Sequence, residues 1–375
     1  MSLIAVDGMG GDAAPAEIVK GVAWLSRARA EEGELLLVGD RDALQRELDK
    51  HEHDPKIITI VPAQGVIPMD AKPRDAVDAM PRASLPLAAA MVAAGEARAL
   101  VSAGNTGAVI LSCARHFQRL EGVRRTALAA VFPTENLHGR NNDPFSLMLD
   151  VGANIRVSAE DLENFAIMGS AYASLISDNP RPRVALLNNG TEASKGPPEL
   201  VAAYQALIKR KDLEFIGNIE GLDIPKGTAD VVVCDGFTGN VVLKMLEGVN
   251  ETVKRLARYA WQSKLHWKIA FFLLGRGISR LKQLTDWRQY GGAPILGFDQ
   301  LCIKAHGRST GRAISNAVRV ARKAVDSGLQ PRIAELLALR ERAGESAPQR
   351  DAPAASTGAD IPVTPAPNAP SSETS

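Results

Sequence analysis

The sequence is poor in several residue types that mark common classes of protein. Its 375 residues include three cysteines (Cys113, Cys234 and Cys302), which lie far apart and form neither a disulfide framework nor a C-x-x-C metal pattern. A reducing compartment and buried, unreactive thiols are therefore expected. Lys plus Arg number 44 and Asp plus Glu 43, a balance that argues against a protein that binds nucleic acid through bulk charge.

Long apolar runs are also missing. No run reaches the ~20 residues that a membrane-spanning helix needs, and no basic region followed by an apolar one opens the chain as in a signal peptide. We therefore expect a cytoplasmic protein. Hydrophobic residues make up 45% and charged residues 23% of the chain, which is ordinary globular composition with material for a large core.

The chain alternates short β-branched or apolar runs with helical segments. This alternation predicts an α/β fold around a mostly parallel sheet. We expect one folded unit over residues 1–344, with a basic, aromatic helical segment protruding at about 249–286. Residues 345–375 are rich in Pro, Ala, Ser and Thr and hold no aromatic residue. Such a composition predicts a disordered tail.

The most informative stretch is residues 230–244, which read DVVVCDGFTGNVVLK. A buried strand, a glycine-bearing turn and a helix aim backbone N–H groups and the positive helix end at an anion. Similar turns occur at 7–12, 103–107, 150–154 and 188–196. The alternative is that their glycines serve backbone geometry alone. None of the turns matches a P-loop or a strict G-x-G-x-x-G motif.

In parallel sheets, ligands bind beyond the carboxyl ends of the strands, where these turns are expected to lie. Their side chains are mainly Asn and Thr with a single Lys, which suits a small oxyanion. Carboxylates and histidines are too scattered for a metal cage, so we predict no metal site.

Eight strings in order carry a resemblance to one bacterial family. They are VDGMGGDAAP (6–15), VSAGNTGAV (101–109), LDVGANI (149–155), ALLNNGTEASKG (185–196), IGNIEGLDI (216–224), VVVCDGFTGNVVLKMLEG (231–248), YGGAPILGF (290–298) and IKAHG (303–307). The chain resembles the acyl-[acyl carrier protein]:phosphate acyltransferases over about residues 1–330. The resemblance implies a three-layer α/β/α homodimer related to phosphotransacetylases and to the isopropylmalate dehydrogenase architecture.

The resemblance also implies the reaction: a long fatty acyl group passes from acyl carrier protein to inorganic phosphate, with no cofactor. The product, an acyl phosphate, would feed a membrane glycerol-3-phosphate acyltransferase in phospholipid synthesis. A thiol leaving group with a pKa near ~8.5 needs little acid help, so positioning and oxyanion stabilisation could suffice. No signature of a Ser or Cys nucleophile is visible.

We predict three catalytic residues. Lys195 would stabilise phosphate or oxyanion charge, Asn240 would donate to phosphate or the thioester carbonyl, and His306 would donate or shuttle a proton. A surface lysine, a helix cap and a core imidazole are the respective alternatives. The predicted phosphate- or substrate-binding residues are Gly10, Gly11, Asp12, Gly104, Asn105, Thr106, Asn154, Asn188, Glu192, Asp235, Thr238 and Gly239.

The segment from Thr252 to Thr285 holds eight Lys or Arg and no Asp or Glu. Its apolar residues suit peripheral contact with an anionic membrane surface; those predicted to make it are Trp261, Trp267, Phe271, Phe272 and Leu274. A docking patch for acidic acyl carrier protein, or a helical hairpin buried in a dimer interface, are the alternatives, and these roles can coexist.

Other functions remain open from the sequence. A short-chain phosphotransacylase that uses acyl-CoA shares the phosphate chemistry but does not explain the basic aromatic segment. A dehydrogenase of related fold would need a ribose-binding acidic residue about 20 residues after a glycine-rich turn. A non-enzymatic membrane scaffold would need none of the polar turns.

Overall fold

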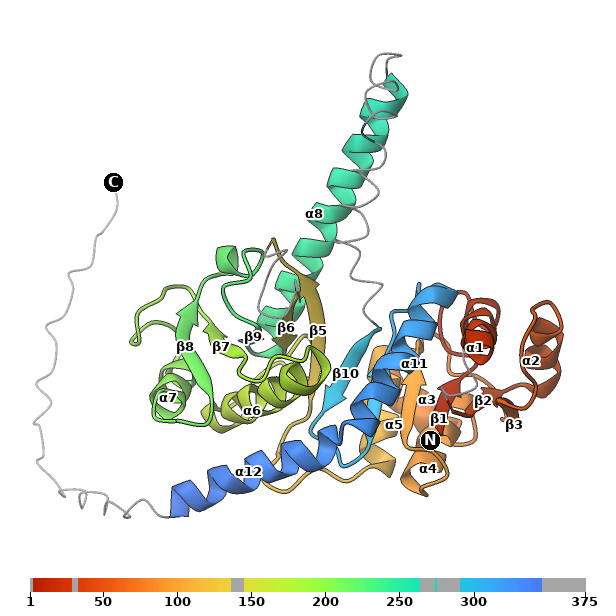
Figure 1. Ribbon diagram of the computed structural model, residues 1–375, viewed down its shortest axis with the longest axis horizontal. Helices are drawn as coiled ribbons and strands as arrows, with labels where there is room; N and C mark the ends of the chain where they lie inside the picture. Colours follow the sequence, from red (N-terminus) through yellow and green to blue (C-terminus); the bar gives the residue numbers. More distant parts are fainter. Residues whose placement is uncertain (1–2, 29–32, 136–144, 264–273, 275–290, 346–375) are drawn as a thin grey trace, which may run out of the picture.

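The computed structural model describes residues 3–28, 33–135, 145–263, 274 and 291–345 (Figure 1). Its centre is an eleven-stranded sheet in the order β3-β2-β1-β4-β11-β10-β5-β6-β9-β7-β8. In chain order the strands are β1 (Ile4–Asp7), β2 (Leu35–Gly39), β3 (Ile58–Pro62), β4 (Ala99–Ser102), β5 (Ala127–Pro133), β6 (Phe145–Leu149), β7 (Arg183–Leu187), β8 (Glu214–Ile219), β9 (Val231–Val233), β10 (Ala293–Leu296) and β11 (Leu301–Lys304).

Helices cover both faces of this sheet, which confirms the three-layer α/β/α arrangement. Side chains of β1 alternate: Ile4 and Val6 join one apolar cluster, and Ala5 joins the other. The first cluster includes α1 (Ala16–Ala28), α2 (Arg41–Leu48), α6 (Ala159–Ile176), α7 (Pro198–Leu207), α11 (Gly311–Asp326) and α12 (Leu329–Glu345). The second includes α3 (Pro73–Ala79), α4 (Ser84–Ala93), α5 (Thr106–His116) and the start of α8 (Gly236–Ser263).

The sheet consists of two parallel halves that run in opposite directions. β3, β2, β1, β4 and β11 are mutually parallel and form the first half-sheet. β6, β9, β7 and β8 are mutually parallel and form the second. Between them, β10 and β5 pair antiparallel with each other and with both neighbours. The expectation of a mostly parallel sheet is confirmed, but its strands do not share one carboxyl edge.

The register of the central strands nevertheless brings the two sets of carboxyl ends together. Lys304 at the end of β11 pairs with Ser102 on β4 and with Ala293 on β10. Two residues further along β10, Ile295 pairs with Leu128 on β5. On β5, the next residue, Ala129, pairs with Leu149 at the end of β6. The two half-sheets therefore end at nearly the same level and approach it from opposite sides.

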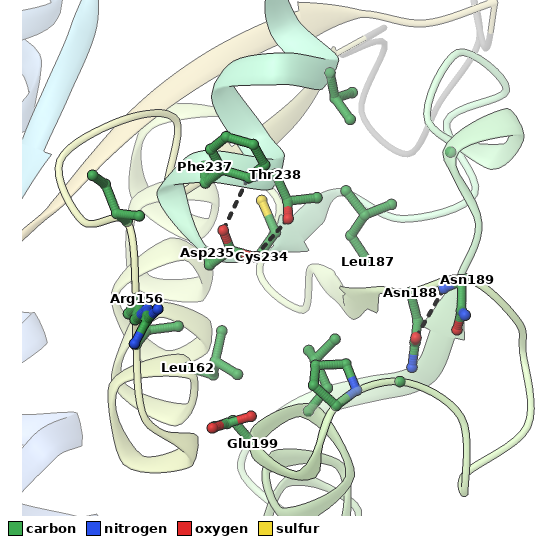
Figure 2. A pocket seen from close by; sticks show the side chains of 17 residues that line it. Arg156, Leu162, Leu187, Asn188, Asn189, Glu199, Cys234, Asp235, Phe237 and Thr238 are labelled. Carbon is green, nitrogen blue, oxygen red and sulfur yellow. Dashed lines mark hydrogen bonds between the residues drawn. The ribbon is translucent and has the colours of Figure 1, made fainter. Parts of the chain in front are cut away.

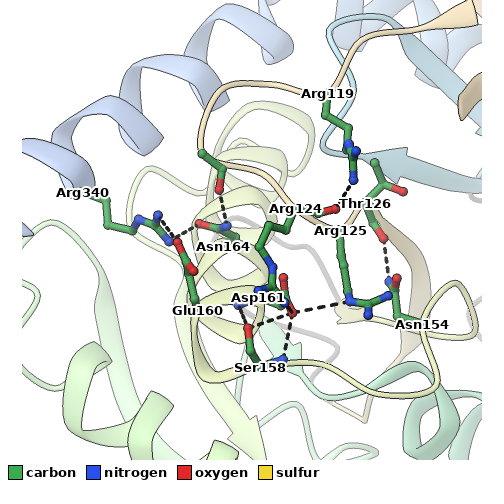
Figure 3. Close-up of polar contacts among 11 residues, drawn as sticks. Arg119, Arg124, Arg125, Thr126, Asn154, Ser158, Glu160, Asp161, Asn164 and Arg340 are labelled. Atoms are coloured by element: carbon green, nitrogen blue, oxygen red, sulfur yellow. Dashed lines mark hydrogen bonds and ion pairs between the residues drawn. The ribbon is translucent and has the colours of Figure 1, made fainter.

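Polar contacts fasten α12 to α6, which lies on the same face of the sheet (Figure 3). Arg340 donates to Asn164 Oδ1 and to Glu160 Oε1 on α6, both at 2.8 Å. The start of α6 is fixed by a capping box between Ser158 and the buried Asp161. These contacts hold the described end of the folded unit against its core.

Helix α8 runs without a break from Gly236 to Ser263 and projects from the body of the molecule (Figure 1). Only its start packs on the core, through Val242, Leu243 and Leu246. Spacings of three and four residues place a row of apolar side chains on one side of the helix. This exposed row comprises Val241, Met245, Val249, Val253, Leu256 and Tyr259, each more than half exposed. No helix within the described part of the chain is long and apolar enough to cross a membrane.

The predicted membrane contacts lie at and beyond the end of this helix. Trp261 is in α8 and partly exposed, and Leu274 is exposed. Trp267, Phe271 and Phe272 lie outside the described residues, as do residues 346–375 of the predicted tail.

Candidate active site

The converging strand ends line a cavity of about 390 Å³, which we call the central pocket. The first half-sheet contributes Thr106 after β4, and Lys304 and His306 at and after β11. The second contributes Gly152 after β6 and Asn240 after β9. The remaining lining residues are Gly107, Ile110, Leu128, Ala130, Val131, Val151, Leu243, Lys244, Glu247, Gly292, Ala293 and Ala305. Three predicted site residues from distant turns thus share one pocket.

Asn240 lies in the first turn and a half of α8, against the turn that follows β6. A Cβ atom added to Gly152 would lie 3.7 Å from Asn240 Cγ, and the φ of Gly152 is +138°, where side chains are strained. The backbone conformation therefore favours glycine there, and the Asn240 side chain lies directly over the turn. The start of the helix is capped by Asp235, which accepts from the N–H and the hydroxyl of Thr238 at 2.9 and 2.6 Å. Asn240 is therefore not the capping residue.

His306 is exposed and follows β11. Its Nδ1 accepts a hydrogen bond of 3.1 Å from the Arg308 N–H. Because one nitrogen of a neutral imidazole accepts and the other donates, this contact places the proton on Nε2. The ring can therefore donate a hydrogen bond from Nε2. The alternative of a core imidazole is wrong for this residue.

Lys304 is a charged lining residue that is absent from the predicted site. It ends the apolar strand LCIK immediately before the polar turn, and only 6% of the residue is exposed. Burial lowers the pKa of its ammonium group to about 8, although Cys302, Asp7 and Asp12 act in the opposite direction. A lysine that ends an apolar strand beside a candidate turn is the signal that could have revealed it.

Asp150 organises the turn beneath Asn240. It is fully buried, and its carboxylate accepts from the backbone N–H groups of Leu128, Gly152, Ala153 and Asn154 at 2.7–3.1 Å, and from Asn154 Nδ2 at 2.9 Å. Burial raises the pKa of Asp150, and these hydrogen bonds oppose the rise. The carboxylate thus ties β5 to the 150–154 turn and supports the pocket wall.

A second, larger cavity lies on the other side of the first turns of α8 (Figure 2). This lateral cavity has a volume of about 880 Å³. Its lining residues are Ile155, Arg156, Val157, Leu162, Leu187, Asn188, Asn189, Gly196, Pro197, Glu199, Leu200, Gly221, Cys234, Asp235, Phe237, Thr238 and Val242. The predicted residues Asn188, Asp235 and Thr238 lie here and not in the central pocket. Phe237 and Ile155, both largely exposed, make part of this lining apolar.

The other asparagines predicted as ligands hold loops together. Asn105 donates to the Met69 and Ala71 carbonyls and caps α5 by accepting from the Ala108 N–H. Asn154 donates to the Thr126 carbonyl and to Asp150. Asn188 donates to the Lys195 carbonyl and accepts from the Asn189 N–H. In all three, the side-chain amide of the Asn is engaged within the protein.

The turn 7–12 packs beside the pocket rather than lining it. Asp12 N–H donates to the Gly307 carbonyl at 2.8 Å. A Cβ atom on Gly10 would lie 2.8 Å from the Gly104 nitrogen, whereas one on Gly11 would lie 3.2 Å from the Gly307 oxygen. Gly10, Gly11, Asp12 and Gly104 therefore bring three strand ends into close contact.

Lys195 and Glu192 are exposed on the 188–196 turn and line neither cavity. Gly239 is buried, and a Cβ atom there would lie 1.9 Å from the Asp150 carbonyl oxygen. Its glycine is required by the close approach of α8 to the 150–154 turn. The three cysteines are buried, as expected.

Comparison of the sequence with known proteins assigns the chain to a family. The family model described as "Fatty acid synthesis protein" matches residues 2–332. A phosphate acyltransferase from Trichlorobacter lovleyi is 41% identical over 350 residues, 92% of this chain and 99% of the relative. One from Nostoc punctiforme is 41% identical over 342 residues, covering 91% and 98%.

The chain belongs to the phosphate acyltransferase family.

Solved structures with lower identity share its fold. A phosphotransacetylase from Streptococcus pyogenes superposes with a TM-score of 0.56 at 18% identity, covering 87% of this chain and 94% of that one. A branched-chain phosphotransacylase from Enterococcus faecalis gives a TM-score of 0.52 at 15% identity, covering 87% and 99%. These likenesses confirm the phosphotransacetylase-like fold.

Proposed function

We propose that this protein transfers a long-chain fatty acyl group from acyl carrier protein to inorganic phosphate and releases acyl phosphate for phospholipid synthesis. The observation that carries the proposal is the convergence of Thr106, Asn240 and His306 from separate strand ends in one pocket. The relatives named phosphate acyltransferase support the same activity. Residues 1–344 would form the catalytic unit.

In this reaction a phosphate oxygen attacks the thioester carbonyl carbon, and the C–S bond breaks as the thiolate leaves. The Asn240 amide and His306 Nε2–H are suited to donate to the phosphate or to the oxyanion of the tetrahedral intermediate. Thr106 adds a hydroxyl at the start of α5, where N–H groups and the helix dipole favour an anion. Holding both substrates in the pocket would supply the proximity that the reaction needs.

We include the remaining predicted binding residues in this proposal, although they lie outside the central pocket. Lys195, exposed near the lateral cavity, would contribute charge to phosphate or to the acyl donor, beside Glu192. Asn188, Asp235 and Thr238 would meet substrate in the lateral cavity. Gly10, Gly11, Asp12, Gly104, Asn105, Asn154 and Gly239 would act by shaping the turns.

The lateral cavity favours a long acyl chain over the alternative, a short-chain acyl-CoA phosphotransacylase. Its volume falls within the range of about 300–1,000 Å³ typical of small-molecule sites. Leu162, Leu187 and Val242 give it an apolar interior beside the first turns of α8, the helix that carries Asn240. Leu162 and Leu187 are labelled in Figure 2. Burying each methylene of a chain there would contribute about 0.8 kcal/mol.

The decisive assay incubates the protein with acyl-acyl carrier protein, with and without inorganic phosphate, and measures acyl phosphate. We expect thioester loss that depends on phosphate and continues with chelator and without nucleotide. Palmitoyl and acetyl donors, each presented on acyl carrier protein and on coenzyme A, separate the two candidate functions. Preference for acetyl-CoA would favour the short-chain alternative, and activity restored only by a divalent metal would contradict the metal-free mechanism.

We further propose that α8 joins two copies of the chain and carries a membrane contact at its far end. An exposed apolar row on a projecting helix is suited to pairing with the same row of a second copy. The basic aromatic residues beyond it would then meet anionic lipid without insertion of a spanning helix. A peripheral position would deliver acyl phosphate to a membrane glycerol-3-phosphate acyltransferase while the site stays open to cytoplasmic acyl carrier protein.

Changing Phe271→Asp together with Leu274→Asp is expected to abolish co-sedimentation with anionic vesicles, because two carboxylates would oppose entry into the headgroup region. Wild-type binding should weaken with added salt, and turnover of the variant in solution should stay close to wild type. Light scattering provides the control: the variant should keep the mass of a dimer. A monomeric variant would instead place these residues in the subunit interface.

A further inference from the structure

Lys304 is a buried cation at the wall of the central pocket. It ends β11, pairs in register with Ser102 on β4 and Ala293 on β10, and lines the pocket with Ala305 and His306. In the described part of the chain, the hydrogen bond found for its Nζ goes to the Ala305 carbonyl, and no carboxylate oxygen lies within 4.0 Å. An ammonium group carries three donors, so this contact does not satisfy it.

The acidic groups around Lys304 are occupied elsewhere or more distant. Asp7 on β1 is buried, and its oxygens accept from the Ser102 hydroxyl at 2.7 Å and the Met9 N–H at 3.2 Å. Burial raises the pKa of Asp7, which weakens it as a counter-charge. Asp12 is partly exposed, and its Oδ2 lies 4.0 Å from Arg308 Nε. On the pocket side stand His306 and, on α8, Lys244 and Glu247.

A buried charge without a close partner is costly, and an anion from solution can supply the partner. The lowered pKa of Lys304 has this origin: removal from water disfavours the ammonium form more than the surrounding carboxylates favour it. A structural ion pair would show a carboxylate in contact with Nζ. A purely apolar use of the side chain would not place it at a pocket shared with Thr106, Asn240 and His306.

We propose that Lys304 is the fixed cation that binds the phosphate nucleophile in the central pocket, opposite Asn240 and beside His306. This assignment rests on the proposed phosphate acyltransferase function and names a binding residue for its second substrate. Lys304 would hold the phosphate by charge and by hydrogen bonds from Nζ. A phosphate oxygen would then face the thioester carbonyl, and the thiolate would leave toward solvent. The amine itself forms no covalent bond.

The test compares Lys304→Met with Lys304→Arg, using Lys226→Met, an exposed lysine paired with Asp223, as the matched control. Methionine is unbranched, close to lysine in length and uncharged, and burying it should not unfold the protein. We expect Lys304→Met to raise the KM for inorganic phosphate on the order of 10–100-fold, the usual worth of a hydrogen bond to a charged group. The KM for the acyl donor should change little.

A binding measurement without turnover separates this inference from the proposed function. Inorganic phosphate alone should raise the melting temperature of the wild type and of Lys226→Met, but not of Lys304→Met. Phosphate affinity of the wild type should fall as pH rises through about 8, where Lys304 loses its proton, whereas Lys304→Arg should retain it because arginine stays protonated. A folded Lys304→Met with wild-type phosphate KM and thermal shift would overturn the assignment. A different outcome is possible: Lys304→Met loses the thermal shift while the wild type makes no acyl phosphate. That result would support Lys304 as a phosphate-binding residue and refute the proposed reaction.

Discussion

Replacing Asn240 by Ala is expected to lower kcat about 10²–10³-fold, the usual cost of removing one preorganised donor to a developing oxyanion. The amide lines the central pocket against Gly152 and does not cap α8, since Asp235 does so. Steady-state kinetics with acyl-acyl carrier protein and phosphate would measure the loss. Thermal unfolding should stay close to wild type, because Ala is a good helix former and the side chain is only half-buried.

Asn250→Ala is the matched control for this change. Asn250 lies on the same helix, ten residues beyond Asn240 and outside the lining of either cavity. The chemical change and its effect on helix propensity are the same as in Asn240→Ala. Because Asn250 lines neither cavity, we expect kcat of Asn250→Ala to equal that of the wild type. A loss below about threefold in Asn240→Ala, far under the range for an oxyanion donor, would remove Asn240 from the catalytic residues.

Replacing Asp150 by Ala is expected to reduce the free energy of unfolding by about 4 kcal/mol or more and to abolish turnover. Four backbone N–H groups and the Asn154 amide would lose their common acceptor inside the protein. Each unsatisfied buried donor costs about 1–3 kcal/mol, reduced where water enters the space. Urea unfolding followed by circular dichroism would measure the change.

Asp40→Ala provides the comparison, since Asp40 is an exposed carboxylate that accepts from the Ala43 N–H at the start of α2. That change should cost about 1 kcal/mol and leave activity intact. Asp150→Asn keeps one acceptor oxygen and should fall between the two. Equal losses in Asp150→Ala and Asp40→Ala would show that the 150–154 turn does not depend on its carboxylate.

Local patterns in the sequence were sufficient for many elements of the fold, but not for α3, β10 or α12. The apolar run Val231–Val233 predicted a strand buried on both faces, and the structure confirms it. Asp235 and Thr238 followed by an apolar helical pattern predicted a turn into a helix, and a capped helix begins there. These features depend on residues close in the chain, where propensity, capping and burial act over a few positions.

The composition of the site was also visible in part. Polar residues that follow strands in glycine-bearing turns predict Thr106, Asn240 and His306 as site residues, and these three meet in one pocket. Asn105 and Asn154 have the same sequence signature, yet their amides hold neighbouring loops. An asparagine after a strand is equally suited to both uses, because a side-chain amide bonds the backbone of a turn as readily as a ligand.

Tertiary structure alone decided which turns share a pocket. The sequence does not show that the two half-sheets run in opposite directions. This arrangement depends on pairing between distant segments: Ile295 on β10 pairs with Leu128 on β5, and Leu301 on β11 pairs with Ala99 on β4. That pairing places the ends of β4 and β11 level with the end of β6 and separates Asn188 from Asn240. It also buries Lys304. The ammonium group needs a bound anion as partner only because the surrounding strands have excluded water from it. The sequence by itself determined which types of side chain follow the strands. The distances between these side chains and their burial depend on long-range strand register, which no local pattern specifies.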